Sequence, residues 1–201
     1  MFRIFRKSCA KYFQKRIEPY IILPGPVEID EAQVGAKRFW LFPYQWPECR
    51  WMFGMVCRRT KIPVIYYIPN KKHTNLINFI KPHIAPGSIM LSDEHASYVA
   101  TSNGLWSKLA FYGFYHYWIN HSRFYGHEKF NFVHTSLIEN TWNDIRHVHN
   151  ALKMQMDGIK IQEYCDSYSI RKMTTTTMST CTMSTWSFRK CAMTTGPAST
   201  W

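Results

Sequence analysis

The residues best suited to chemistry in this sequence are its few carboxylates. The chain has 13 Asp and Glu against 25 Lys and Arg, so the position of each acid is informative. Asp30, Asp93 and Glu139 fall in three separate elements of the expected fold. Carboxylates brought together from different elements can hold divalent cations, and Mg²⁺ takes oxygen ligands while it keeps several waters. The alternative is that these are ordinary surface acids and helix caps, and their spacing alone does not decide between the two interpretations.

The elements that must position these carboxylates follow from the hydrophobic pattern. Strands are expected at residues 27–31, 51–57, 62–68, 88–93 and 115–120, and helices at 74–84, 96–103 and 134–152. Apolar and polar residues alternate in the first strand, while the helices repeat apolar residues every three or four positions. Gly104 is a suitable residue to end the second helix. Strands first joined by short turns and then alternating with helices imply an α/β fold with a mixed sheet flanked by helices.

Composition divides the 201-residue chain into three parts. A basic segment covers residues 1–26, and the structured domain is expected at 27–152. The remainder, 153–201, is expected to be a tail that is disordered from about residue 169, where Thr, Ser and Met dominate and cannot build a core.

The net charge of +12 favours a polyanionic partner, with nucleic acid first and an acidic membrane surface second. No apolar run approaches the length that spans a bilayer, and the basic N-terminus lacks the apolar core of a secretory signal. The six cysteines contain no CxxC pair and are expected to be reduced thiols. We therefore expect a protein that is neither secreted nor membrane-bound, and that has no small-molecule substrate.

Five short motifs occur in order along the chain. They are Val27-Glu-Ile-Asp-Glu31, Arg50-Trp-Met-Phe-Gly-Met-Val56, Ile84-Ala-Pro-Gly-Ser-Ile-Met-Leu-Ser-Asp-Glu-His-Ala-Ser-Tyr98, Ile119-Asn-His-Ser122 and His134-Thr-Ser-Leu-Ile-Glu-Asn-Thr-Trp142. Together they strongly resemble the ISXO-type insertion-sequence transposases and their eukaryotic relatives, the Merlin DNA transposons. The resemblance covers about residues 26–150.

This resemblance implies a DDE transposase core with an RNase H-like fold. Matched motif by motif, Asp30, Asp93 and Glu139 correspond to the catalytic acids, which would also be the ligands of two Mg²⁺ (or Mn²⁺) ions. The implied reaction is cleavage of a DNA strand by water, followed by attack of the freed 3′-hydroxyl on target DNA. In a eukaryote such a protein would act in the nucleus, and in a bacterium in the cytoplasm.

DNA is the expected partner, and a homodimer is the assembly considered. Arg146 matches a basic position of the family seven residues after the third acid, and two helical turns place it on the same side as Glu139. The residues expected to contact DNA are Arg146, His121, His134, Lys37 and Arg38.

The sequence also departs from the family pattern. The usual Asp-Pro…Thr-Gly stretch is replaced at residues 123–131, and the 26 residues before the core are too few for a domain that recognises the ends of an element. Two alternatives therefore stay open. One is a decayed or domesticated copy that binds DNA without catalysis, and the other is an RNase H-like nuclease that cleaves DNA without joining it.

Overall fold

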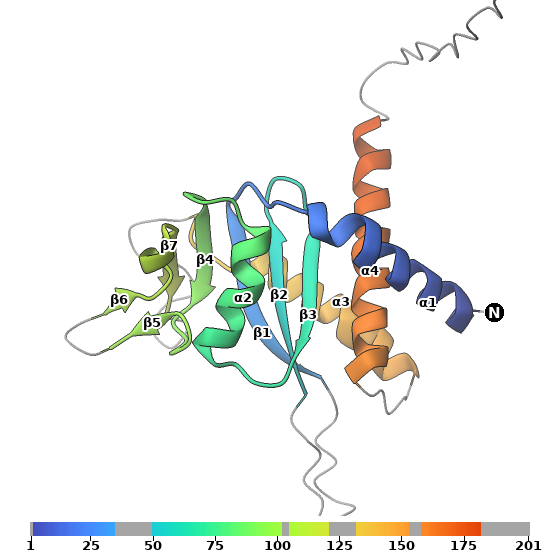
Figure 1. Cartoon of the computed structure of the whole chain (residues 1–201), viewed down its shortest axis with the longest axis horizontal. Coiled ribbons are helices and arrows are strands. Elements are labelled where there is room, and N and C mark those ends of the chain that lie inside the picture. The colour runs from blue at the N-terminus through green and yellow to red at the C-terminus, as the bar shows by residue number, and fades with distance from the viewer. Residues whose placement is uncertain (1, 35–49, 102–104, 121–131, 153–157, 182–201) are drawn as a thin grey trace, which may run out of the picture.

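A computed structural model describes residues 2–34, 50–101, 105–120, 132–152 and 158–181 (Figure 1). Its longer helices are α1 (Phe2–Tyr12), α2 (His73–His83), α3 (Ser136–Leu152) and α4 (Gly158–Cys181), with short helical turns η1 (Phe13–Ile17), η2 (Glu18–Tyr20) and η3 (Ala110–Tyr112). Its strands are β1 (Val27–Val34), β2 (Arg50–Cys57), β3 (Pro63–Ile68), β4 (Ile89–Asp93), β5 (Val99–Ala100), β6 (Trp106–Ser107) and β7 (Tyr115–Ile119).

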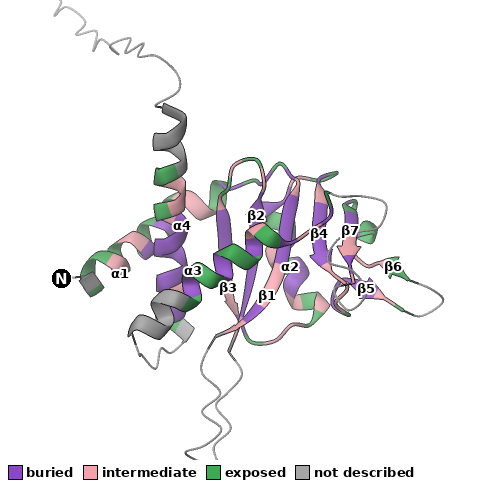
Figure 2. Ribbon diagram, turned by 180° about the vertical axis from the view of Figure 1, so that it is seen from behind, coloured by how far each residue is buried: buried purple, intermediate pink, exposed green. Residues whose placement is uncertain are grey.

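The centre of the molecule is a mixed five-stranded sheet in the order β3-β2-β1-β4-β7. Strand β2 runs antiparallel to both β1 and β3, whereas β1, β4 and β7 are parallel to one another. Helix α2 covers one face of this sheet and α3 the other, as the opposite views of Figures 1 and 2 show. The mixed sheet flanked by helices confirms the α/β class expected from the sequence.

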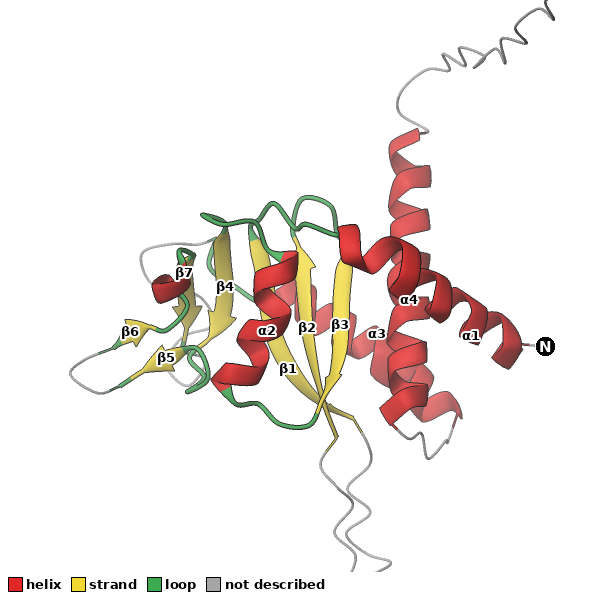
Figure 3. Ribbon diagram, viewed as in Figure 1, coloured by secondary structure: helices red, strands yellow, loops and turns green. Residues whose placement is uncertain are grey.

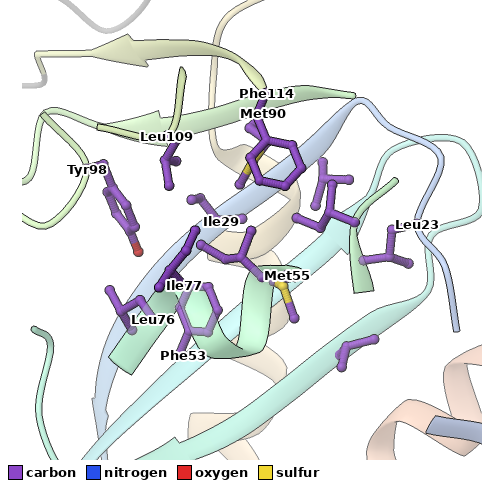
Figure 4. Packing of buried hydrophobic residues seen from close by; sticks show 14 of the residues in the cluster. Leu23, Ile29, Phe53, Met55, Leu76, Ile77, Met90, Tyr98, Leu109 and Phe114 are labelled. Atoms are coloured by element: carbon purple, nitrogen blue, oxygen red, sulfur yellow. The ribbon is translucent and has the colours of Figure 1, made fainter. Parts of the chain in front are cut away.

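Strand β1 has two differently occupied faces because successive side chains of a strand point to opposite sides. Val27 and Ile29 are fully buried in the core on the α2 side, which Figure 4 shows with Ile29, Phe53 and Leu76 close together. Ala32 belongs instead to the core beneath α3 and α4. Asp30 shares the parity of Ala32, so the side chain of Asp30 lies on the α3 face.

Helix α4 closes the β3 edge of the sheet. The side-chain amide of Gln162 accepts a hydrogen bond from the backbone N–H of Tyr67 at 2.7 Å and donates one to the carbonyl of Ile65 at 2.8 Å. These bonds satisfy backbone groups that an exposed edge strand would leave open to pairing with another chain. Helix α1 in turn packs on α4, which joins the N-terminal segment to the C-terminal one (Figure 1).

The helix expected at residues 96–103 is wrong. Val99–Ala100 forms strand β5, which pairs with β6 in a small hairpin beside the main sheet (Figure 3). Tyr98 is completely buried in the core, and its hydroxyl donates a hydrogen bond to Glu31. This long-range tether overrides the local signal because a short helix depends on tertiary packing for most of its stability.

The segment expected to be disordered from about residue 169 is helical up to Cys181. Ile161, Tyr164, Cys165 and Tyr168 are buried at helical spacing against the sheet. Ile170 and Met173 continue the contact with the core, and Lys172 forms a 2.9 Å ion pair with Asp144 of α3. None of the helices in the described part of the chain is long and apolar enough to cross a membrane.

Candidate active site

Asp30 and Asp93 lie side by side on neighbouring parallel strands. Strands β1 and β4 pair Val27 with Met90 and Glu28 with Leu91, and the same register, continued, brings Asp30 level with Asp93. Asp93 is the last residue of β4, and its Oδ1 atom is buried. Two carboxylates at one level of adjacent parallel strands point to the same face, so β1 and β4 present them together.

Burial and neighbouring charge both act on Asp30. The pKa of this carboxyl is raised from 3.8 to about 6, mainly by burial and then by the negative charges of Asp93 and, less strongly, Glu139. The indole Nε1 of Trp142 donates a 2.9 Å hydrogen bond to Asp30 Oδ2, and this bond lowers the pKa. Asp93 and Glu139 therefore each lie within electrostatic reach of Asp30.

Gly54 makes room for the indole that contacts Asp30. It lies opposite Asp30 in the β1–β2 pairing. A Cβ atom on Gly54 would stand 2.6 Å from the Trp142 ring and 2.8 Å from Ile138, far inside van der Waals contact. The glycine in the motif Trp51-Met-Phe-Gly-Met-Val56 therefore lets α3 approach the sheet closely enough for Trp142 to reach the carboxylate.

Glu139 is exposed near the N-terminus of α3 and turns towards its own helix. Its Oε1 atom accepts a 2.9 Å hydrogen bond from Thr135 Oγ1, and its backbone N–H bonds to the Thr135 carbonyl. Glu139 thus lies close enough to influence the Asp30 charge while its carboxylate is held by Thr135.

Glu28 anchors the helix that carries Glu139. This side chain is completely buried, and its Oε2 atom accepts hydrogen bonds from the backbone N–H groups of Leu137 and Ile138 at 2.8 and 3.0 Å. Its Oε1 atom accepts a 2.6 Å bond from Arg58 Nε. A carboxylate at the first turn of a helix satisfies N–H groups that have no partner within the helix and complements the helix dipole.

Arg58 extends this anchor to the segment that enters α3. Its guanidinium donates to the carbonyls of Phe132 and His134 as well as to Glu28. Sequence analysis did not identify Glu28 or Arg58. The sequence does place Glu28 at an inward position of a strand. Charged residues are almost never fully buried unless they are paired, so this position could have indicated a buried ion pair.

Glu31 is a second carboxylate of β1 whose side chain is almost completely buried, and it lies on the opposite face of the strand from Asp30. Burial, followed by the charges of Asp30 and Asp93, raises the pKa of Glu31 to about 8. The Tyr98 hydroxyl donates a hydrogen bond to Glu31 Oε1, and the charge of Lys71 lowers the Glu31 pKa. The Nζ atom of Lys71 lies 3.0 Å from His95 Nε2 and stands over the ring of Trp51. The motif from Asp93 to Tyr98 did not predict the contact of Tyr98 with Glu31.

The donor atoms at Asp30 and Asp93 suit a hard cation. Carboxylate oxygens are the ligands that Mg²⁺ prefers, and a cation would offset the repulsion that raises the Asp30 pKa. Within the described residues, no group of three or more His, Cys, Asp or Glu side chains is arranged to hold a metal ion. The pair Asp30 and Asp93 therefore fits a metal, whereas the carboxylate of Glu139, which Thr135 holds through one oxygen, would have to move closer to become a third ligand.

The expected DNA contacts are only partly within the described structure. Arg146 is exposed on α3, seven residues beyond Glu139. His134 is half-buried; its ring Nδ1 lies 2.7 Å from Ser136 Oγ and 2.9 Å from an Arg58 nitrogen, so this side chain belongs to the α3 anchor. Lys37, Arg38 and His121 lie outside the described residues.

A comparison with models of protein families identifies the family to which this fold and its acids belong. A family model described as an ISXO2-like transposase domain matches residues 22–171, which include every strand of the main sheet together with α2, α3 and the first part of α4. The mixed sheet is consistent with the RNase H-like fold of such a domain. No curated protein sequence matches the chain. With Asp30 and Asp93 on the central strands of the matched region, the chain belongs to the family of ISXO2-like transposase domains.

Proposed function

We propose that this domain is the catalytic core of a DDE-type transposase, which cleaves and joins DNA strands with the help of a divalent metal. The observation that carries the proposal is the pair Asp30 and Asp93, level on adjacent parallel strands, with Glu139 close enough to raise the Asp30 pKa. The family of transposase domains to which the chain belongs supports the same chemistry.

Each acid has a distinct part in the proposed site. Asp30 and Asp93 hold the metal from the sheet, and Glu139 completes the site from α3 once its carboxylate moves towards them. Bound Mg²⁺ or Mn²⁺ would activate the attacking hydroxyl and stabilise the leaving oxygen. Because Asp30 has a pKa of about 6, it is mostly ionised at neutral pH and available as a ligand.

DNA is the proposed substrate. The chain carries a net charge of +12, and Arg146 lies on the same helix as Glu139, where it can contact a phosphate beside the carboxylates. A homodimer stays a prediction from the family resemblance.

The test of the proposal is Mn²⁺ binding measured by calorimetry. Wild type should bind Mn²⁺, and Asp93→Asn should weaken binding at least tenfold, because one ligand loses its charge. The matched control is Asp144→Asn, which neutralises an exposed acid on α3 and should bind like wild type. A folded wild-type protein that binds no Mn²⁺, or equal binding by all three proteins, would contradict the proposal.

A DNA-binding protein without catalysis is the second candidate. It is favoured by the bond that Glu139 accepts from Thr135 and by the absence, among the described residues, of three side chains grouped to hold a metal ion. Nicking and strand-transfer assays with supercoiled plasmid separate the candidates. Strand-transfer products support the transposase, nicks without joining support a nuclease, and DNA binding without either supports the non-catalytic protein.

A further inference from the structure

Helix α1 and the turn that follows it carry a row of positive charges. Arg3, Lys7, Lys11 and Lys15 are spaced four residues apart, and all four are exposed. Residues 2–17 contain two further cations, Arg6 and Arg16, and no Asp or Glu. Residues four apart are neighbours on a helix surface, so these side chains form one row that winds part of the way around the helix, which we call the α1 stripe.

The spacing of the α1 stripe suits a nucleic-acid backbone. With a rise of about 1.5 Å per residue, successive cations are about 6 Å apart and the stripe is about 18 Å long. Duplex DNA carries one negative charge per about 1.7 Å of its axis, or one per about 3.4 Å along each strand. A stripe of this length can therefore contact several successive phosphates of one strand.

The helix that carries the stripe packs against the rest of the domain. Ala10 of α1 and Phe13 of η1 are buried. Gln14 Nε2 donates a 2.6 Å hydrogen bond to Asp166 of α4, and Arg6 lies over the ring of Tyr164. These contacts fix the helix on α4, so the backbone that carries the exposed cations is already ordered before any partner binds.

Within the described part of the chain, the cations of the stripe are not taken up in ion pairs, although Gln14 holds Asp166 of α4 nearby. Among the described residues, none of its four members forms an ion pair, whereas Arg58 is paired with Glu28 and Lys172 with Asp144. The next acid along the chain, Glu18, accepts a hydrogen bond from Tyr66. The stripe is therefore available to an anionic partner.

We propose that the α1 stripe binds the backbone of duplex DNA without reading its sequence, at a surface separate from the carboxylates. The helix lies beyond the β3 edge, whereas Asp30 and Asp93 are on the central strands β1 and β4 (Figure 1). Taking about 5 Å per strand and about 10 Å per helix layer, the two sites are on the order of 20–30 Å apart. The choice of DNA as the polyanion rests on the proposed function.

The test is the salt dependence of binding to a duplex of random sequence, measured with the full chain in EDTA. Removing all four cations (Arg3→Gln, Lys7→Gln, Lys11→Gln and Lys15→Gln together) should make the slope of log K against log salt shallower by up to about 3.6, because each phosphate contact contributes about 0.9. The matched control removes four exposed cations elsewhere, Arg59, Lys61, Lys72 and Lys81, and should change the slope by less than about 1. Circular dichroism verifies that both variants are folded.

Equal slopes for the two variants, or no change in the stripe variant, would overturn the inference. So would binding to phosphatidylserine vesicles that depends on the stripe while DNA binding does not, since an acidic membrane is the competing partner. The Asp93→Asn protein should keep the wild-type slope. Failure of the metal site and failure of the α1 stripe are therefore distinguishable, because the slope is measured without metal and Mn²⁺ binding without DNA.

Discussion

At the scale of single residues, burial raises the pKa of Asp30, and two neighbours then adjust it in opposite directions. The Asp93 charge raises the pKa, and the hydrogen bond from Trp142 lowers it. We therefore expect Asp93→Asn to bring the Asp30 pKa below about 6 and Trp142→Phe to raise it above that value. NMR titration of the Asp30 side-chain carboxyl in metal-free protein measures both shifts.

The opposite signs make this prediction sensitive to geometry. Asp144→Asn on the far part of α3 serves as the control and should leave the Asp30 titration unchanged, because Asp144 interacts with Lys172 and Tyr168 instead. If Trp142→Phe left the Asp30 pKa unchanged, the indole could not be a hydrogen-bond donor to this carboxylate in solution. An unchanged pKa in Asp93→Asn would mean that the two carboxylates are not level.

The sequence predicts which strands and helix carry Asp30, Asp93 and Glu139, but it does not predict the residues that surround these acids. Asp30, Asp93 and Glu139 lie on β1, β4 and α3, as the motifs predict. Glu28 and Glu31 flank Asp30 in the same motif, and their different roles depend on which face of β1 each occupies and on partners far along the chain. Such contacts form only when the chain is folded, and one sequence does not reveal them.

At the scale of elements, the position of α3 depends on the buried Glu28. We expect Glu28→Gln to lower the free energy of unfolding by about 3 kcal/mol, because it breaks an ion pair whose carboxylate is fully buried and leaves the half-buried Arg58 without its charged partner. The amides of Leu137 and Ile138 should also exchange faster with solvent, since both donate to Glu28. Urea unfolding and hydrogen exchange measure these two effects.

A neighbouring cation supplies the control for this experiment. Arg59 is exposed beside Arg58, so Arg59→Gln should change stability by no more than about 0.5 kcal/mol. The double variant Glu28→Gln with Arg58→Met should recover part of the loss, because it no longer buries an unpaired charge. Equal stability of wild type and Glu28→Gln would show that α3 is held by packing alone.

The elements that the sequence predicts best are those whose own pattern agrees with their tertiary contacts. Strands β1, β2, β3, β4 and β7 and helices α2 and α3 all appear within a few residues of the expected bounds. The hairpin of β5 and β6 was missed because its short strands depend on the burial of Tyr98. Helix α4 shows an apolar repeat from Ile161 to Tyr168, but the Thr-rich composition after it suggested a tail.

At the scale of the whole molecule, buried carboxyls couple folding to pH. The pKa of Glu31 is about 8 in the folded protein against an ordinary value of 4.5, and Asp30 and Asp166 are raised to about 6. Below these values the folded protein takes up protons that the unfolded chain does not, so the stabilisation is lost as the pH rises through them. His116 acts in the opposite sense, because burial lowers its pKa to about 4 and stability is lost as the pH falls below 6.5.

These signs predict that the metal-free protein becomes more stable as the pH falls from about 8 to 6.5. Glu31 dominates this window, since Asp30 and Asp166 titrate lower and the opposing effect of His116 falls mainly below 6.5. A single group contributes at most about 1.4 kcal/mol per pH unit. Urea unfolding at several pH values measures the slope, and Glu31→Gln, which keeps an acceptor for Tyr98, should flatten it. Stability that rises with pH in wild type, or an equal slope in both proteins, would mean that Glu31 is ionised in the folded state and that its charge is balanced by Lys71.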